Sequence, residues 1–459
     1  MLHLRGLFGY PAEQVGVKVG SLYLLTSIPA VHARDVNSSV EVSRCMKDMF
    51  EEDSTFHFDP ELLKAWLTLR FNPSERCLLS KRGLKINNSR RLRPQDFKTE
   101  RNLVSADDAA NGLRTVLFEI VQSIAEEIPA GERIGVLSSG GIDSTALMAI
   151  LCRMGFRPES FAIGFGTEND EIESAKEAAD FLGIDHHARI LRSILASTAK
   201  ANVILDEPYR AACFYYDALK FVKDSGVRYV FDGLGVDEFF GGYDFRYRRV
   251  MDLAGSGMGR LDAYLAGSHP NDYVDAKSNM FGHRLKQVEI EWGRLLPYFD
   301  NDLSFLDQIF LADYNGKCRQ NFVPLASFAS SLGITLFYPW LDDRFIDFSM
   351  CVPDEWKYDP RGGSTKILFR KAVHDLVPNS TMKKRKQGFG PSASRAFEEL
   401  RSVGQRVIDG TMVSNGYVNK EYYQEVLGQR SPSVIEVNKL WDLYTLETFL
   451  DEIKSNEVG

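Results

Sequence analysis

The sequence predicts an α/β fold in which a parallel sheet is followed by a largely helical part, with a smaller β-rich domain at the N-terminus. Three observations support this prediction. The 459 residues exceed the length at which one hydrophobic core stops growing. Between residues 134 and 231, apolar strands alternate with helices of about ten residues, which is the pattern of βαβ units. Beyond residue 250, apolar residues recur mainly at helical spacing.

The N-terminal domain is expected to span residues 1–97. Up to residue 57, short apolar runs alternate with turn residues, as in small β-strands. A short helix is predicted over residues 60–69. Residues 81–94 are dense in Arg, Lys and Asn, and we interpret this segment as an interdomain linker.

The second domain is expected to span residues 98–459. It opens with a helical pattern, and its strands are short apolar runs bounded by turn residues. An extended insertion is expected around residues 255–278. The predicted elements are helix 106–128, strand 134–137, helix 145–154, strand 160–165, helix 171–182, helix 215–225 and strand 229–231.

Composition excludes several classes of protein. A net charge of -8 argues against a broad basic surface for nucleic acid, so small molecules or peptides are the expected partners. The six cysteines lack metal-ligand spacing and read as buried apolar residues in a reducing compartment. Arg5, Glu13 and Lys18 interrupt the first 25 residues, so we expect no signal peptide, no membrane partner and a cytoplasmic location. Assembly into a homo-oligomer stays open.

The loop Ser139-Gly140-Gly141-Ile142-Asp143-Ser144 carries the chemistry. It lies between an apolar strand and a helix, where glycines let the backbone approach an anion and the helix N-terminus presents amides. Asp143 would repel a phosphate unless a divalent cation lay between them, so its presence indicates Mg²⁺. The alternative is that the two glycines serve loop geometry alone.

This loop resembles the SGGxDS pyrophosphate loop of the PP-loop ATP pyrophosphatases, which cleave ATP to AMP and pyrophosphate. Residues 232–243, DGLGVDEFFGGY, are similar to the GxGxDExFGGY segment of the asparagine synthetase branch. Residues 339–342, Lys366 with Arg370, and residues 385–390 resemble later blocks of that branch. The resemblance therefore extends over residues 100–395 and implies ATP and Mg²⁺ as cofactors.

The resemblance also implies a role for each matching residue. Asp143 and Asp237 would bind Mg²⁺, although Asp237 alone could be a turn or cap residue. Lys366 would contact phosphate, and Lys386 would stabilise developing charge, unless residues 383–386 are a solvated charge run. Strand 160–165 would present backbone groups to adenine. Asp170-Glu171 resembles the acidic pair at the start of the family's next helix, where the two residues act either at the site or as the helix cap. The nucleotide would be held by Ser139, Gly140, Gly141, Asp143, Ser144, Gly233 and Gly235. Three arginines follow the second glycine pair, namely Arg246, Arg248 and Arg249. The sequence leaves open whether their side chains reach the site.

Two departures from the family pattern narrow the function. Common asparagine synthetases begin with a catalytic cysteine after Met1, whereas residue 2 here is Leu, so we expect a reduced, non-catalytic glutaminase-like domain. Leu234 stands where the asparagine-forming enzymes have Glu and the β-lactam synthetases have Tyr, and leucine cannot accept a proton. The nearest titratable substitutes are Glu238, Asp313, Tyr314 and Tyr338, none of them favoured over a core or cap role.

The leading hypothesis is therefore an ATP-dependent amide or lactam synthetase. A substrate bearing both a carboxylate and an amine would be adenylated and then close on itself, because intramolecular capture raises the effective concentration of the amine. The β-lactam synthetases work this way. Alternatives are a lasso-peptide macrolactam cyclase, an ammonia-dependent asparagine synthetase or other amidating ligase, a tRNA-modifying PP-loop enzyme and an inactive binding protein.

Overall fold

The fold is taken from a computed structural model of the chain. It describes residues 31–36, 39–43, 60–69, 84–86, 92–97, 105–166, 171–205, 207–210, 212–268, 279–384 and 390–455. Everything below concerns these residues.

A five-stranded parallel sheet organises the molecule, in the order β6-β5-β4-β7-β8. Ile134 and Val136 of the central strand are buried, as expected for a strand covered on both faces. Leu137 pairs with Asp232, so β4 and β7 end side by side. The strands are β4 (Ile134–Leu137), β5 (Glu159–Gly164), β6 (His186–Ile190), β7 (Tyr229–Asp232) and β8 (Thr335–Phe337).

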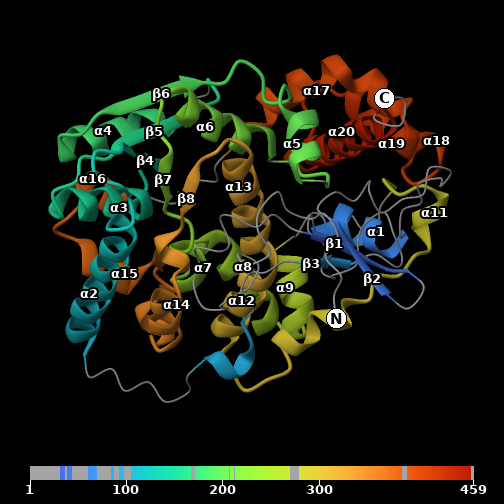
Figure 1. Ribbon diagram of the computed structural model, residues 1–459. Helices are drawn as coiled ribbons and strands as arrows, with labels where there is room; N and C mark the ends of the chain where they lie inside the picture. The colour runs from blue at the N-terminus through green and yellow to red at the C-terminus, as the bar shows by residue number, and fades with distance from the viewer. Residues whose placement is uncertain are drawn as a thin grey trace.

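Helices cover both faces of the sheet. Helices α3 (Ile142–Arg153) and α4 (Ile172–Leu182) lie on one side, and α6 (Ala212–Asp224) and α13 (Arg319–Ser331) on the other (Figure 1). Preceding them is α2 (Ala106–Ala125), which is capped by the Ser105 hydroxyl. These elements confirm the predicted α/β class.

The remaining helices follow the predicted trend toward a helical C-terminal half. The long helix α20 packs against α17, at the end of the molecule remote from α2 (Figure 1). None of the described helices is long and apolar enough to cross a membrane. Their bounds are α5 (Thr198–Leu205), α7 (Val236–Phe239), α8 (Asp244–Gly255), α9 (Arg260–Ser268), α11 (His283–Lys286), α12 (Phe305–Asp313), α14 (Asp343–Met350), α15 (Ile367–Val373), α16 (Asn379–Lys383), α17 (Ala393–Ile408), α18 (Thr411–Ser414), α19 (Lys420–Gly428) and α20 (Val434–Ser455).

The described N-terminal residues form a small antiparallel sheet and one helix. Strands β1 (Val31–Val36), β2 (Ser39–Ser43) and β3 (Leu84–Ile86) are ordered β2-β1-β3. Helix α1 (Pro60–Leu69) buries Leu62, Leu63 and Leu67 in the same core as the second half of the chain. Its Lys64 Nζ also donates to the Val288 carbonyl at 2.6 Å. The division at residues 97 and 98 stays a prediction.

Three sequence expectations about elements were wrong or incomplete. The segment 81–94 is not only a linker, because β3 lies within it and pairs with β1. The insertion expected to be extended contains helix α9, while residues 269–278 lie outside the described part. Strand β6 was missed because its sequence, HHARI, has no apolar run and its side chains are partly exposed at a sheet edge.

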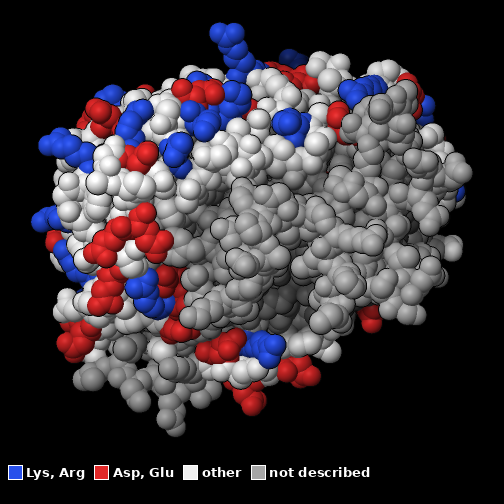
Figure 2. Space-filling model, in the orientation of Figure 1, with Lys and Arg blue, Asp and Glu red and all other residues white. Residues whose placement is uncertain are grey.

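A buried ion pair lies inside the helical half. The guanidinium of Arg246 forms a two-pronged ion pair with the Asp313 carboxylate, and both side chains are almost fully buried. Tyr264 donates a hydrogen bond to the same carboxylate at 2.9 Å. On the surface, by contrast, Lys and Arg alternate with Asp and Glu over the described part of the face in Figure 2.

We expect Asp313→Asn to lower the free energy of unfolding by about 3–5 kcal/mol, because it leaves the buried Arg246 charge uncompensated. Urea unfolding measures the difference. The control is Asp180→Asn, which breaks the exposed pair between Lys176 and Asp180 and should change stability by less than about 1 kcal/mol. Equal effects of the two variants would show that the Arg246–Asp313 pair does not stabilise the fold.

Candidate active site

The site lies where the strand order changes direction. From β4 the chain proceeds outward through β5 to β6, whereas β7 and β8 lie on the other side of β4. In open parallel sheets, ligands bind outside the carboxyl ends of the strands at such a point. The loops after β4 and β7 meet here, and each carries an aspartate predicted from the sequence.

The loop after β4 is shaped for an anion. Gly140 adopts a left-handed conformation with φ of 62°, and a Cβ there would overlap the Ser174 backbone of α4. The amide of Gly140 donates to the Ser138 hydroxyl at 3.3 Å, and that of Gly141 to the Ser139 hydroxyl at 3.3 Å. These hydrogen bonds are long, so phosphate oxygens could replace them at small cost. With the N-terminus of α3 behind it, the loop is a ready anion site.

The loop after β7 is held against this one. Gly233 lines the pocket beside Ser144. Gly235 has φ of 126°, and a Cβ there would overlap the Trp340 carbonyl, so this glycine serves packing and does not line the pocket. The Trp340 indole donates to the Asp143 carbonyl at 3.4 Å, so the loop after β4 contacts the side chain of the residue whose backbone packs against Gly235.

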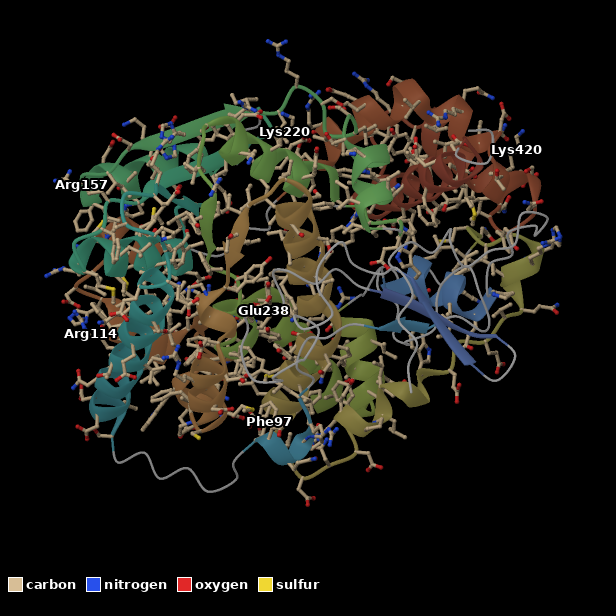
Figure 3. All side chains as sticks on the ribbon, viewed as in Figure 1. Phe97, Arg114, Arg157, Lys220, Glu238 and Lys420 are labelled. Atoms are coloured by element: carbon tan, nitrogen blue, oxygen red, sulfur yellow. The ribbon has the colours of Figure 1, made fainter. Side chains whose placement is uncertain are left out.

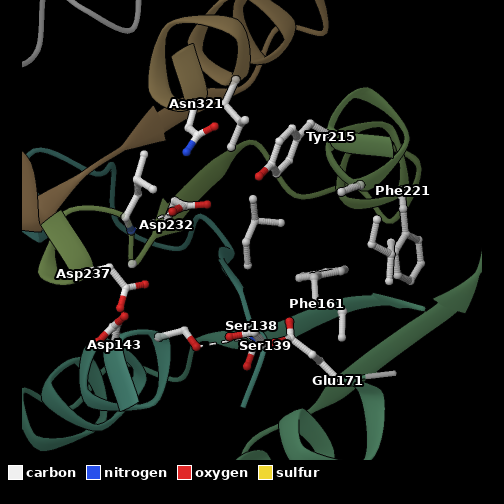
Figure 4. A pocket seen from close by; sticks show the side chains of 18 residues that line it. Ser138, Ser139, Asp143, Phe161, Glu171, Tyr215, Phe221, Asp232, Asp237 and Asn321 are labelled. Carbon is white, nitrogen blue, oxygen red and sulfur yellow. Dashed lines mark hydrogen bonds between the residues drawn. The ribbon is translucent and has the colours of Figure 1, made fainter. Parts of the chain in front are cut away.

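Asp143 and Asp237 converge on Lys366. The ammonium of Lys366 lies 2.6 and 2.8 Å from the two Asp143 carboxylate oxygens and 2.5 Å from Asp237 Oδ1. Figure 4 shows the two carboxylates side by side at one end of the pocket. Lys366 is 4% exposed. Three residues from separate parts of the sequence thus form one buried charged cluster.

The Lys366 backbone is itself unusual. Its φ of 55° and ψ of 36° place it in the left-handed region, the sole non-glycine residue there among the described residues. Its amide donates to the Phe240 carbonyl at 2.8 Å, and its carbonyl accepts from the Arg370 amide at 2.7 Å. Such a conformation costs about 1–3 kcal/mol and is concentrated at functional sites.

The two carboxylates fit a Mg²⁺ site. They already surround a cationic group, the Lys366 ammonium, and Mg²⁺ commonly takes one or two carboxylates together with substrate phosphates and water. No group of three or more His, Cys, Asp or Glu suited to a metal occurs among the described residues. The other ligands of an ion here would therefore be phosphate and water oxygens.

Glu238, which the sequence offered as a candidate catalytic residue in place of the missing base, lies next to this cluster but not in the pocket. It is buried in the interior (Figure 3) and accepts a hydrogen bond from Tyr243 Oη at 2.8 Å. Burial and the neighbouring Asp237 raise the pKa of Glu238 to about 7. The pocket lining does not include it, so a direct role on a ligand has no support in this geometry.

The pocket extends from the carboxylates along the sheet edge (Figure 4). One wall is apolar and formed by β5 and α6, where strand 160–165 was predicted to meet adenine. At the end lined by Tyr215 and Asn321 the pocket has polar groups that the sequence did not single out, whereas Phe161 and Phe221 line another end (Figure 4). Tyr209 Oη donates to Asn321 Oδ1 at 3.1 Å. The lining residues are Leu137, Ser138, Ser139, Asp143, Ser144, Phe161, Ala162, Ile163, Glu171, Tyr215, Ala218, Phe221, Asp232, Gly233, Leu234, Asp237, Asn321 and Leu325.

Leu234 also lines the pocket, and it is the position at which this sequence lacks the proton acceptor of related enzymes. Its amide donates to Asp232 Oδ1 at 2.8 Å, and the Asp232 carboxylate lines the pocket too. Asp232 could have been noticed as a carboxylate at the end of a strand, just before a glycine. Tyr215 and Asn321, from helices distant in sequence, gave no comparable signal.

The proposed substitutes for a base lie elsewhere. Tyr338 donates to the Phe322 carbonyl at 3.0 Å inside the core. Tyr314 packs against the rings of Phe239 and Phe322, and Asp313 is engaged by Arg246. None of these three residues lines the pocket, so the structure favours a core role for each over a role as the base.

The arginines after the second glycine pair also miss the pocket. Arg246 is committed to Asp313, as described above. Arg248 forms an exposed ion pair with Asp244 at 3.0 Å. Arg249 is exposed on α8 and is not part of the lining.

Lys386 and Asp170 lie outside the described residues. The residues that precede Lys386 are nevertheless anchored at the loop after β4, because Lys384 Nζ donates to the Ser139 carbonyl at 2.9 Å. Arg370 supports the same segment by donating to the Met382 carbonyl at 2.6 Å. The placement of Lys386 itself stays a prediction.

Comparison with known proteins places these features in a family. The family model described as Asparagine synthase matches residues 116–451. The asparagine synthetase [glutamine-hydrolyzing] 1 of Bacillus subtilis (strain 168) is 22% identical over 87% of this chain and 70% of its own length. The chicken (Gallus gallus) asparagine synthetase [glutamine-hydrolyzing] is 25% identical over 64% of this chain, which spans 45% of that relative.

A solved NMN synthetase from Francisella tularensis aligns with 63% of this chain at 11% identity and a TM-score of 0.21, too low to bear on the fold. The family match covers most of the chain, including both glycine loops, Asp143, Asp237 and Lys366. The chain therefore belongs to the asparagine synthase family of ATP-dependent ligases.

Proposed function

We propose that this ligase adenylates a carboxylate of a small substrate and joins it to an amine of the same molecule, forming a lactam. The observation that supports this proposal most directly is the cluster of Asp143, Asp237 and Lys366 at the carboxyl ends of β4 and β7. The anion loop lies on one side of the cluster and a partly polar pocket on the other. ATP would lie across the loop, and the substrate would occupy the polar end.

Each part of the site has a task in this proposal. The Gly140 and Gly141 amides and the N-terminus of α3 hold the β- and γ-phosphates as they become pyrophosphate. Asp143 and Asp237 would hold Mg²⁺, which would supply positive charge to the pyrophosphate that leaves. Lys366 contacts the phosphate at which the substrate carboxylate attacks, where a fixed cation stabilises the transition state.

The pocket chemistry supports a substrate that brings its own amine. Leu234 offers an apolar surface, so the glutamate-dependent route of the asparagine-forming enzymes has no counterpart at this position. Asp232, Tyr215 and Asn321 provide polar groups for a substrate carrying an amine and a carboxylate. A cytoplasmic location and a nitrogen source other than glutamine remain parts of the proposal.

The main rival is amidation by free ammonia, with asparagine as the product. It is favoured by the relatives, which carry the name asparagine synthetase. The two functions differ in one measurable respect. Lactam formation needs no added ammonium, whereas amidation does.

The test supplies the purified chain with Mg²⁺, ATP and a panel of acidic amino acids, β-amino acids and short peptides, with and without ammonium. We expect AMP and pyrophosphate, and a product one water lighter than the substrate without ammonium. If the product forms only when ammonium is added, the lactam proposal is wrong and the chain is an amidating ligase. Absence of AMP and pyrophosphate with every substrate and with a bacterial extract would contradict the ligase proposal.

Removal of one carboxylate should uncouple the nucleotide from the metal. In Asp143→Asn, we expect Mg²⁺ to lose its effect on the affinity for α,β-methylene ATP, which cannot be cleaved between its α- and β-phosphates. The loss should be about tenfold or more, because a charged ligand of the ion is gone. Calorimetry measures both affinities, and Asp180→Asn should behave as the wild type. A Mg²⁺ effect of normal size in Asp143→Asn would rule out the metal role.

The anion loop can be tested through its packing. Gly140→Ala should reduce affinity for α,β-methylene ATP by about tenfold or more, because the new Cβ forces the loop away from α4. Gly183→Ala is the matched control, since Gly183 has φ of 66° with open space around its Cβ position. Both variants bear the same backbone strain. Equal nucleotide affinities would show that the loop does not bind the phosphates.

A further inference from the structure

We propose that Lys366 is an exchangeable counter-ion that holds the divalent-cation position until the nucleotide arrives. Without nucleotide, its ammonium binds both carboxylates. When ATP enters, the ammonium moves to phosphate, and the divalent cation takes its place. The cation and the nucleotide therefore bind together. This inference rests on the proposed function and specifies how its metal site forms.

The geometry makes the ammonium and a shared metal ion mutually exclusive. The Lys366 nitrogen contacts oxygens of Asp143 and Asp237 at 2.5 to 2.8 Å. Mg²⁺ would bind the same oxygens at about 2.0–2.1 Å. An ion bridging the two carboxylates would thus overlap the ammonium, so one must leave before the other binds.

The anchoring of Lys366 leaves the side chain as the part that moves. Its amide and carbonyl are both hydrogen-bonded, to Phe240 and Arg370. Glycine at position 242 leaves room beside the cluster, because a Cβ there would overlap Asp237 Oδ1 and lie 2.8 Å from Lys366 Cε. A lysine side chain has a flexible four-carbon stem, and rotation about its bonds can move the ammonium from a carboxylate to a neighbouring phosphate.

Charge explains why the nucleotide has to drive the exchange. Two carboxylates and one ammonium leave the cluster with a single negative charge, so a divalent cation alone gains little by displacing a buried lysine. The described residues offer no third acidic or imidazole ligand for that cation. Phosphate oxygens supply both the missing metal ligands and a new partner for Lys366.

The first experiment needs no variant. Mn²⁺ serves as the probe, and its free concentration is followed by electron paramagnetic resonance. We expect wild-type protein to bind Mn²⁺ at least about tenfold more tightly with saturating α,β-methylene ATP than without it, after correction for Mn²⁺ bound to free nucleotide. Equal affinity with and without the nucleotide would overturn the inference.

The second experiment removes the counter-ion. Lys366→Met keeps an unbranched side chain without charge, and it should gain a nucleotide-independent Mn²⁺ site and a rise in Tm on addition of Mn²⁺. Lys357→Met is the matched control, because Lys357 is as deeply buried but its ammonium pairs with a carboxylate outside the cluster, that of Asp307, at 2.9 Å. It should gain neither. In Lys366→Met/Asp237→Asn, the gained site should be lost.

The outcomes separate the two proposals. If Mn²⁺ binds the wild type tightly without nucleotide, or if Lys366→Met gains no site, the exchange is wrong while the ligase proposal stands. If the wild type binds neither Mn²⁺ nor α,β-methylene ATP when both are present, the ATP site itself is wrong. Should Lys366→Met fail to fold, the wild-type comparison can still overturn the exchange, because equal Mn²⁺ affinity with and without nucleotide contradicts it.

Discussion

The contact of one ammonium with two carboxylates is the interaction around which the rest of the site is arranged. Asp143 begins α3 after β4, Asp237 lies on α7 after β7, and Lys366 precedes α15 in the helical half. Like charges this close are tolerated because an opposite charge lies between them. The cluster thus joins the parallel sheet to the helices that follow it.

The surrounding fold keeps these three groups in place. Because β4 and β7 are neighbours in register, their two loops leave the sheet at the same point. Trp340 is fully buried and bonds the Asp143 carbonyl, while the chain at Gly235 packs closely against it. The strained Lys366 backbone is held by hydrogen bonds on both sides. A rigid frame therefore surrounds the Lys366 side chain, whose ammonium contacts both carboxylates.

Much of the architecture could be predicted from the sequence. The apolar runs of β4, β5 and β7 and the helices between them have clear periodicity, and the confirmed elements differ from expectation by a few residues at most. The anion loop and its aspartate followed from the residue types between strand and helix. Edge strand β6 was not predicted because HHARI has no apolar run, and pairing with β5 makes it a strand. The short strand β8 does lie in an apolar run, but it interrupts a region whose pattern is mainly helical.

The sequence alone determined the family resemblance, the use of two loops and the identity of their charged residues, because these depend on local motifs. Only the tertiary structure decided which charged groups meet. It placed Lys366 between Asp143 and Asp237, committed Arg246 to Asp313, and kept Glu238 out of the pocket while bringing in Asp232, Tyr215 and Asn321. The physical reason is distance along the chain: residues 67 (Arg246 and Asp313) to 223 (Asp143 and Lys366) positions apart become neighbours through packing that no local pattern encodes.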